Sequence, residues 1–409
     1  MQKPTRPMSC TIFGRADAWH MPRRPLMDPA HQKTTLRLFL CGDVMLGRGI
    51  DQILPEPCSS ELHEDYVHSA LEYVRLAEAA NGPVKWPVAH AYVWGAALDE
   101  LERAKADLRI INLETTITRS EDYAPKGINY RMSPENAATL LAAHIDCCVL
   151  ANNHILDWGR AGLLDTLTTL NGLGIKYAGA GHTFEEASSA AILPIPGKRR
   201  VLVYSFAATS SGTPRNWVAT PGSTGVNLLS DLSNATIARI KKRVIDERQP
   251  GDVIVVSIHW GPNWGYEVPE AQRRFAHALI DEVGVSVVHG HSSHHAKALE
   301  VYRDRLILYG CGDFLNDYEG IRGYENYRSN LALMYLVDVA VTDGTLSGIE
   351  IIPLSIKQLR LAQASTADVE WIRHTLDSES RKLDTTVTKA SSTQLTAAST
   401  IERHIHSHQ

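Results

Sequence analysis

Four histidines lie within seven positions in the octapeptide VHGHSSHH, residues 288–295. They are His289, His291, His294 and His295. Imidazole is a common metal ligand, and its ordinary pKa lies close to neutrality. Taken alone, the stretch is compatible with a metal site, an acid–base cluster or a solvated loop that is rich in histidine.

Polar side chains also follow short apolar runs elsewhere in the chain. The residues in these positions are Asp43, Asn112, Glu114, Asn152, Asn153, His154, Asp157, His259, the histidines of the octapeptide and Asp313. In α/β sheets, ligands bind at the carboxyl ends of the strands. One shared site would explain all of these residues together, whereas structural roles would have to be found for each one separately.

The residue types indicate which chemistry such a site could support. Carboxylate, amide and imidazole groups, with no cysteine in a ligand position, suit divalent ions such as Mn, Fe and Zn. A two-metal centre could use a bridging carboxylate, either Glu114 or Asp43, and would lower the pKa of a bound water. Asp157, three residues after His154, could orient that histidine as a general acid.

Structural interpretations of the same residues stay open. Asp43 could cap a turn, Glu114 could be a solvated loop carboxylate, and His259 could pack against Trp260 and Trp264. The histidines at the edges of the octapeptide could be a core residue and a supporting residue. Arg48, Arg131 and Asn263 lie in loops next to these motifs; an arginine there could hold a carboxylate or phosphate oxygen, or form a surface salt bridge.

The elements that would position these side chains are predicted strands that are apolar on both faces, as in sheets covered by helices. They span residues 36–42, 108–112, 146–151, 201–206, 253–258, 285–289 and 306–310. A helix is predicted around Leu163–Leu170, and a hairpin joins 331–341 to 346–354 through Asp343-Gly344. The pattern predicts an α/β domain over residues 35–360, after a flexible leader (1–34) and before a C-terminal helix and flexible tail (361–409).

Composition excludes several classes of protein. The net charge of −5 over 409 residues, with both signs scattered, argues against a nucleic-acid binder. No apolar run is long enough for a transmembrane segment, and the N-terminus lacks the apolar region of a signal peptide. Cys41, Cys147 and Cys148 lie inside apolar runs, which favours buried thiols and a reducing, cytoplasmic location.

Six motifs together carry a resemblance to a known family. GDVMLGR (42–48), NLETTIT (112–118), ANNHILDWG (151–159), HWG (259–261), GHSSHH (290–295) and YGCGDFLNDY (309–318) resemble, in order, the CapA family of poly-γ-glutamate capsule biosynthesis proteins. That family is related to the calcineurin-like metallophosphoesterases. The resemblance implies a four-layer α/β/β/α sandwich with a metal site at the edge of its two sheets.

The resemblance also implies roles for individual residues. The implied metal ligands are Asp43, Glu114 as the bridging acid, Asn153, His259, His291 and His294. His154 would be the general acid. Two departures from the phosphoesterase pattern are Asp43-Val44-Met45 in place of Asp-x-His, and Gly-His-x-x-His in place of Gly-His-x-His.

The resemblance leaves two functions open. One is a metal-dependent hydrolase that acts on a phosphoester or a γ-glutamyl amide bond, with a small-molecule or polyglutamate-like substrate. The other is a non-catalytic accessory protein that binds polyglutamate or nucleotide while it associates with other capsule-synthesis proteins. A dinucleotide-binding enzyme is excluded, because no G-x-G-x-x-G follows the first strand.

Overall fold

Two β-sheets dominate the part of the chain that the computed structural model describes, residues 34–401 apart from 196 and 198. The larger sheet has the order β19-β20-β17-β16-β1-β2-β5-β6, with β15 beside β1 and β18 beside β17. Its strands are β1 (Thr35–Val44), β2 (Leu108–Leu113), β5 (Cys147–Val149), β6 (Lys176–Ala178), β15 (Asp313–Leu315), β16 (Leu331–Ala340), β17 (Leu346–Ile356), β18 (Leu361–Gln363), β19 (Thr385–Lys389) and β20 (Leu395–Ser399).

The smaller sheet has the order β13-β14-β12-β11-β9-β8. Its strands are β8 (Ala191–Ile195), β9 (Arg199–Ala207), β11 (Val253–His259), β12 (Val287–His291), β13 (Leu299–Tyr302) and β14 (Arg305–Leu308). Two short pairs stand apart from both sheets: β3 (Thr116–Ile117) with β4 (Arg131–Met132), and β7 (Ala180–Gly181) with β10 (Gly225–Val226).

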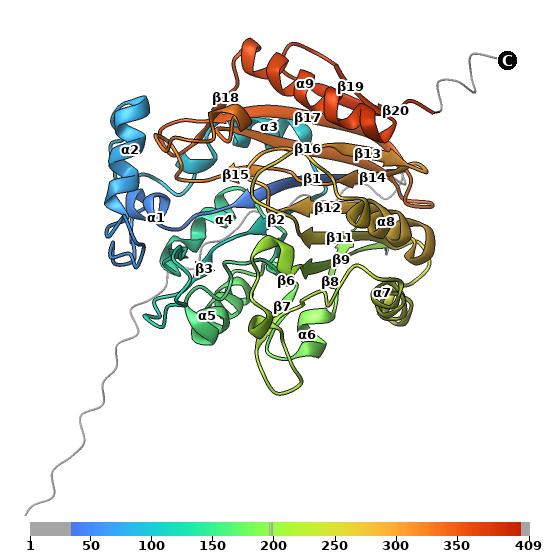
Figure 1. The fold of residues 1–409 in the computed structure, drawn as a ribbon, viewed down its shortest axis with the longest axis horizontal. Helices are drawn as coiled ribbons and strands as arrows, with labels where there is room; N and C mark the ends of the chain where they lie inside the picture. Colours follow the sequence, from blue (N-terminus) through green and yellow to red (C-terminus); the bar gives the residue numbers. More distant parts are fainter. Residues whose placement is uncertain (1–33, 196, 198, 402–409) are drawn as a thin grey trace, which may run out of the picture. The chain divides into compact units, whose positions relative to one another are not determined.

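Helices fill the connections between strands (Figure 1). They are α1 (Gly49–Ile53), α2 (Leu71–Asn81), α3 (Ala96–Ala104), α4 (Ala138–Ala142), α5 (Gly159–Gly172), α6 (Phe184–Ser188), α7 (Asn234–Glu247), α8 (Glu270–Ala278) and α9 (Thr366–Ser380). The predicted α/β class is confirmed, as are the seven predicted strands, which lie in β1, β2, β5, β9, β11, β12 and β14. The predicted helix is α5, and the predicted hairpin is β16 with β17.

Three apolar cores explain why the two sheets hold together. One core contains side chains from both sheets, such as Leu38 of β1 and Val255 of β11. A second joins the other face of the larger sheet to α3, α4 and α5, and a third joins the smaller sheet to α7 and α8. Each sheet is therefore buried on both faces, which accounts for strands that are apolar throughout rather than alternating.

The C-terminal region is more ordered than the sequence predicts. Helix α9 begins with a capping box formed by Ser365 and Asp368. The expected flexible tail then forms β19 and β20, which extend the larger sheet. The prediction missed this hairpin because its Ser- and Thr-rich composition hid the alternation of β20, which buries Leu395 and Ala397, and the buried Val387 of β19. Residues 1–33 and 402–409, which hold most of the leader and the last three histidines, lie outside the described residues.

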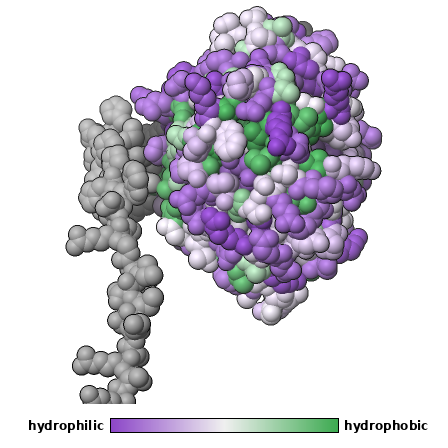
Figure 2. All heavy atoms as spheres, turned by 90° about the vertical axis from the view of Figure 1, so that its left-hand side faces the viewer, coloured by the Kyte–Doolittle hydropathy of each residue, from purple (hydrophilic) through white to green (hydrophobic). Residues whose placement is uncertain are grey.

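The surface near α1 and α2 and the cysteines differ in their surroundings. The face that carries α1 and α2 is mostly hydrophilic, with smaller hydrophobic patches between the polar side chains (Figure 2). Among the described residues, no helix has both the length and the apolar character needed to span a membrane. Five cysteines in the described region are buried with free thiols, including the three predicted to be buried.

Candidate metal centre

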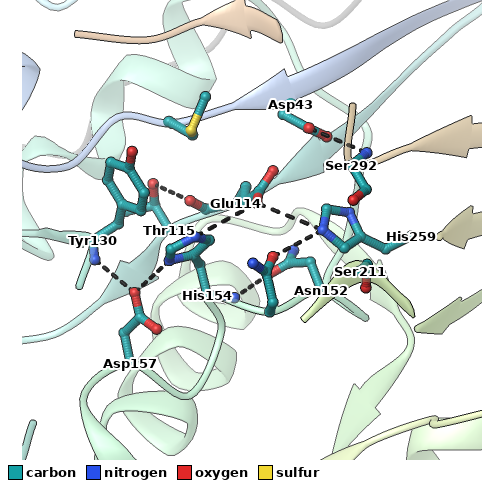
Figure 3. A network of polar contacts seen from close by, with 12 residues as sticks. Asp43, Glu114, Thr115, Tyr130, Asn152, His154, Asp157, Ser211, His259 and Ser292 are labelled. Atoms are coloured by element: carbon teal, nitrogen blue, oxygen red, sulfur yellow. Dashed lines mark hydrogen bonds and ion pairs between the residues drawn. The ribbon is translucent and has the colours of Figure 1, made fainter. Parts of the chain in front are cut away.

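The ends of strands from both sheets meet at one buried site. In the larger sheet, Asp43 at the end of β1 pairs in register with Asn112 of β2 and Asp313 of β15. In the smaller sheet, His259 at the end of β11 stands opposite His291 at the end of β12. Figure 3 shows side chains from these strand ends and the following loops pointing toward one another.

Asp43 belongs to two groups of potential metal ligands. The first group is Asp43, His259 and His291, and the second is Asp43, His294 and Asp313. Within each group the ligand atoms lie within 4.8 Å of one another, and all five residues are buried. Asp43 is therefore the residue common to both groups of potential ligands, and a bridging carboxylate from Glu114 or Asp43 stays a prediction.

Neighbouring groups hold the Asp43 carboxylate in a fixed position. Asn112 donates from Nδ2 to Oδ1 at 2.8 Å, and Asn152 donates in turn to the Asn112 side chain at 3.0 Å. The backbone N–H of Ser292 donates to Oδ2 at 3.2 Å (Figure 3). Ser292 has a φ of 106°, a conformation that costs a non-glycine residue free energy and that is typical of functional sites.

Glu114 lies beside the first ligand group, and one of its carboxyl oxygens has no hydrogen-bond partner among the described residues. Its Oε1 is 3.6 Å from Nε2 of His259 and 3.8 Å from Nε2 of His154. Its buried Oε2 accepts no hydrogen bond from any described residue. Burial raises the pKa of Glu114 well above its usual range, and the charge of Asp43 acts in the same direction.

The site therefore has an excess of buried negative groups, which a cation would balance. Burial and, to a smaller extent, the charge of Asp313 together raise the pKa of Asp43 to about 7. Buried carboxylates are costly unless they are paired or coordinate a metal ion. Three carboxylates with imidazole nitrogens at the same place, and an orphan oxygen on Glu114, fit a divalent cation such as Mn, Fe or Zn.

The histidines of the site differ in their electrostatic surroundings. Burial lowers the pKa values of His259 and His291 well below the usual value, so both rings are neutral and can offer a lone pair. His294 behaves differently, since its Nδ1 lies 2.9 Å from Oδ1 of Asp313. Burial lowers the pKa of His294, but the charge and hydrogen bond of Asp313 together with the charge of Asp43 raise it overall.

A pair formed by His154 and Asp157 lies next to the carboxylates. Nδ1 of His154 is 2.6 Å from Oδ2 of Asp157, and the same carboxylate accepts from Tyr130 N at 2.6 Å and Lys126 Nζ at 2.7 Å. Because a carboxylate held by other donors acts as an acceptor, His154 donates from Nδ1 and presents Nε2 toward Glu114. Burial lowers the pKa of His154 to about 4, and the Asp157 charge only partly opposes this shift.

Asn153 connects this pair to the first ligand group. Its Oδ1 lies 2.8 Å from Nε2 of His259, and its backbone carbonyl accepts a hydrogen bond from Lys126. Asn152 instead donates from Nδ2 to the Leu113 carbonyl of β2 and accepts from the His154 backbone N–H. The structure thus places the Asn153 amide beside the site and uses the Asn152 amide to hold the loop.

Two arginines predicted to bind substrate have other partners in the structure, and their contact with a substrate stays a prediction. Arg48 is buried and donates to both carboxylate oxygens of Asp317 and to Glu64. Arg131 donates to Glu121, and its guanidinium group lies 3.7 Å from the centre of the Trp158 ring. Loop position suggested free guanidinium groups, but nearby carboxylates and an aromatic ring occupy both.

Asn263 and the remaining histidines of the octapeptide surround the site. The Asn263 side chain is exposed, and its backbone carbonyl accepts from His294 N at 3.0 Å. His295 stacks near Tyr327 at 4.6 Å between ring centroids. His289 is fully buried and donates from Nε2 to the Cys41 carbonyl at 2.7 Å. The octapeptide therefore supplies residues to the ligand groups and to their support.

Comparison with known proteins identifies the family. Residues 37–318 match the profile of a family described as bacterial capsule synthesis protein PGA_cap. The chain belongs to this capsule synthesis family. The matched region contains every residue of the two ligand groups and the His154–Asp157 pair.

Curated relatives of this family member carry related names. A probable polyglutamine synthesis accessory protein of Mycobacterium tuberculosis is 46% identical over 347 residues, which is 84% of this chain and 91% of the relative. The capsule biosynthesis protein CapA of Bacillus anthracis is 23% identical over 82% of this chain and 70% of its own length. A phosphatase structure from Mycoplasma pneumoniae covers 80% of this chain and 95% of its own, with 12% identity and a TM-score of 0.43. That structural likeness is too weak to bear on the site.

Two residues of this capsule synthesis protein's site were absent from the predicted ligands and catalytic groups. Asp313 had a signal, since it follows the apolar run 306–310 as Asp43 follows the run before it. Lys126 had none, because it lies in a loop without periodicity and reaches the His154–Asp157 pair only through the fold.

Proposed function

We propose that this capsule synthesis protein is a metal-dependent hydrolase that cuts a phosphoester or γ-glutamyl amide bond in a small or polyglutamate-like substrate. The observation that carries the proposal is the buried set of carboxylates and neutral imidazoles beside a histidine that is tied to a carboxylate. Structural roles would not require three buried carboxyl groups in one place, one of them with an oxygen that lacks a hydrogen-bond partner.

Asp43, His259, His291, His294 and Asp313 would hold the cation, with Glu114 and Asn153 beside them. A bound divalent ion polarises a substrate oxygen and lowers the pKa of water at neutral pH. The metals that suit these donors are Mn, Fe and Zn. The proposal extends to the predicted four-layer α/β/β/α sandwich, which the cores between the sheets and beneath the helices support.

The chain's own residues supply proton transfer and orientation. Asp157 fixes the ring of His154, so that Nε2 can give a proton to a leaving group or take one from an attacking water. Lys126 holds the other oxygen of Asp157 and keeps that carboxylate in place. The exposed side chain of Asn263, next to His294, is a candidate substrate contact.

An accessory role without turnover is the second candidate, because the Mycobacterium relative is named an accessory protein. In that case the same site would bind polyglutamate or nucleotide during assembly with other capsule-synthesis proteins. The two candidates differ in turnover and agree on the ligand groups, so a combined measurement of metal content and activity separates them.

The test uses the full-length protein, its metal content and its activity with Mn²⁺ toward aryl phosphates and γ-glutamyl anilides. We expect bound metal and turnover of one substrate class, with both lost in Asp43→Asn and His259→Ala. Asp51→Asn is the matched control, since Asp51 is equally buried but accepts from Cys58 N at 2.7 Å. A wild type without metal contradicts the proposal, and metal without turnover favours the accessory role.

A second variant tests the proton-transfer pair separately. His154→Gln should lower turnover by about 10²–10⁴-fold, the usual contribution of general acid–base catalysis, and should leave metal content unchanged. If His154→Gln keeps full activity, His154 is not the proton-transfer group.

A further inference from the structure

A line of hydrogen bonds runs from the larger sheet through the smaller sheet to a ligand of the first group. Nε2 of His289 lies 2.7 Å from the Cys41 carbonyl oxygen of β1, and Nδ1 of His289 lies 3.1 Å from Oγ of Ser257. The same Ser257 oxygen lies 2.7 Å from Nε2 of His291. Ser257, His289 and His291 are all buried, so water does not compete for these groups.

An irregularity in β1 accounts for the position of the first acceptor. The pairing of β1 with β16 ends at Leu40 and Tyr335, and the register with β2 shifts between Leu40 and Asp43. Such a bulge takes a residue out of the ladder and re-aims the backbone. At this shift the Cys41 carbonyl is turned toward the smaller sheet, where His289 meets it.

The direction of each hydrogen bond follows from the chemistry of its partners. A carbonyl oxygen only accepts, so His289 carries its proton on Nε2 and its Nδ1 has a lone pair. Among the described residues, the partners of His289 are an uncharged carbonyl and an uncharged hydroxyl, and neither would hold a second proton on the ring. Ser257 therefore donates its one proton to His289 and can only accept from His291.

From this geometry we propose that His289 and Ser257 are positioning residues that keep His291 in the Nε2–H tautomer. His291 then presents the Nδ1 lone pair to the first ligand group, where Nδ1 is 3.8 Å from Oδ1 of Asp43. Hydrogen bonds beyond the direct ligands commonly fix the tautomer of a metal-binding histidine in this way. The consequence for metal affinity rests on the proposed function, whereas the tautomer itself does not.

The line also accounts for the place where a cation is needed. Nδ1 of His259 lies 2.7 Å from Nδ1 of His291, and Nε2 of His259 lies 2.8 Å from Oδ1 of Asn153. Once His291 offers a lone pair, a neutral His259 faces two acceptors with a single proton. One of the two contacts therefore brings two lone pairs together without a proton between them. A metal ion within the ligand group would supply the missing positive charge.

The direct test is the tautomer of His291 in the metal-free, full-length protein. Long-range ¹H–¹⁵N correlation spectra of ring-labelled histidine distinguish protonated from unprotonated ring nitrogens, and His291→Gln assigns the signals. We expect Nε2 protonated and Nδ1 unprotonated in the wild type. A wild-type His291 that is protonated on Nδ1 overturns the proposal.

Variants then test whether Ser257 and His289 set the tautomer of His291. Ser257→Ala and His289→Leu should give a mixture of tautomers and weaken Zn²⁺ binding by about 10- to 100-fold. His289→Asn, which keeps an acceptor for Ser257, should restore both properties. Ser205→Ala is the matched control, because Ser205 pairs in register with Ser257 and is buried, but its hydroxyl has no hydrogen-bond partner in the described structure.

The outcomes separate this inference from the proposed function. If Ser257→Ala leaves both the tautomer and the Zn²⁺ affinity as in the wild type, the positioning role is wrong. If the wild type binds no Zn²⁺, the proposed function fails, and the tautomers of His291 in wild type and Ser257→Ala still decide the positioning role.

Discussion

Two buried clusters in this protein each contain carboxylates, but they differ in whether every carboxylate has a donor. In one, Arg48 donates to Asp317 and Glu64, so a guanidinium group lies between two carboxylates. In the other, Asp43, Glu114 and Asp313 are brought together, and Glu114 Oε2 has no donor among the described residues. The first cluster is complete in the sense that both of its carboxylates accept from Arg48, whereas in the second Glu114 Oε2 has no donor that a described residue supplies.

The difference shows how a binding site can be told from a structural ion pair. Arg48 remains charged: burial lowers its pKa, but Asp317 and its other neighbours raise it overall. At the second cluster, by contrast, burial and the charge of Asp313 outweigh the groups that lower the pKa of Asp43, which rises to about 7. A site that keeps unbalanced carboxylates in the interior is one that a cation stabilises.

The largest expected effect comes from breaking the complete cluster. Arg48→Met should lower the free energy of unfolding by about 3–5 kcal/mol, because it leaves Asp317 and Glu64 buried without their partner. Urea unfolding of the metal-free protein measures this change. Asp43→Asn serves as the comparison, and it should leave the metal-free protein as stable as the wild type or more so. Equal losses in both variants would remove the distinction between the clusters.

Metal binding should stabilise the second cluster only. Mn²⁺ at about 100 times its dissociation constant should raise the free energy of unfolding by about 2.7 kcal/mol, since the ion binds the folded state. The gain should vanish in Asp43→Asn and persist in Glu64→Gln, as measured by unfolding with and without a chelator. A gain that survives in Asp43→Asn would place the ion elsewhere.

Much of the fold could be predicted from the sequence, because buried strands and their ends have local signatures. Apolar runs such as 253–258 predict strands covered on both faces, and the polar residue after each run predicts the shared edge. The β19–β20 hairpin could not be predicted in the same way. Its alternation is short and consists of small or β-branched residues, and it becomes a strand pair only through packing on β17.

The candidate ligands could be predicted from their residue types and positions in the sequence. The roles of the arginines could not, because they depend on which distant residues become their partners. Asp43, His259 and His291 follow strands, so their meeting could be expected before the fold was known. The role of Arg48 depends on Asp317, which lies 269 positions away in the sequence. No local pattern shows whether a guanidinium group is already occupied, so Arg48 and Arg131 were expected in the substrate pocket.

The pH dependence of stability should also separate the clusters. The pKa of Asp43 is raised from 3.8 to about 7 in the folded state, so between these values the folded protein holds a proton that the unfolded chain releases. Metal-free stability should therefore fall as pH rises from about 4 to 7, by up to about 1.4 kcal/mol per pH unit for one proton. Unfolding across this range should show a shallower slope in Asp43→Asn; an unchanged slope would mean that Asp43 is ionised throughout.

The smallest expected effect concerns an ion pair that resembles the complete cluster in geometry but not in exposure. Arg131 lies 2.9 Å from Glu121, much as Arg48 lies 2.8 Å from Glu64. The Glu121 side chain is 72% exposed, whereas that of Glu64 is 9% exposed. Water already solvates Glu121, so Glu121→Gln should cost less than about 1 kcal/mol in urea unfolding, with a further decrease at high salt.

Glu64→Gln, measured in parallel, should lower the free energy of unfolding more than Glu121→Gln does. The buried Arg48 then loses a charged partner in a place that water does not reach. If the two variants cost the same, burial would not be what distinguishes these pairs. The unbalanced carboxylates around Asp43 would then be no stronger an indication of a cation site than an ion pair at the surface.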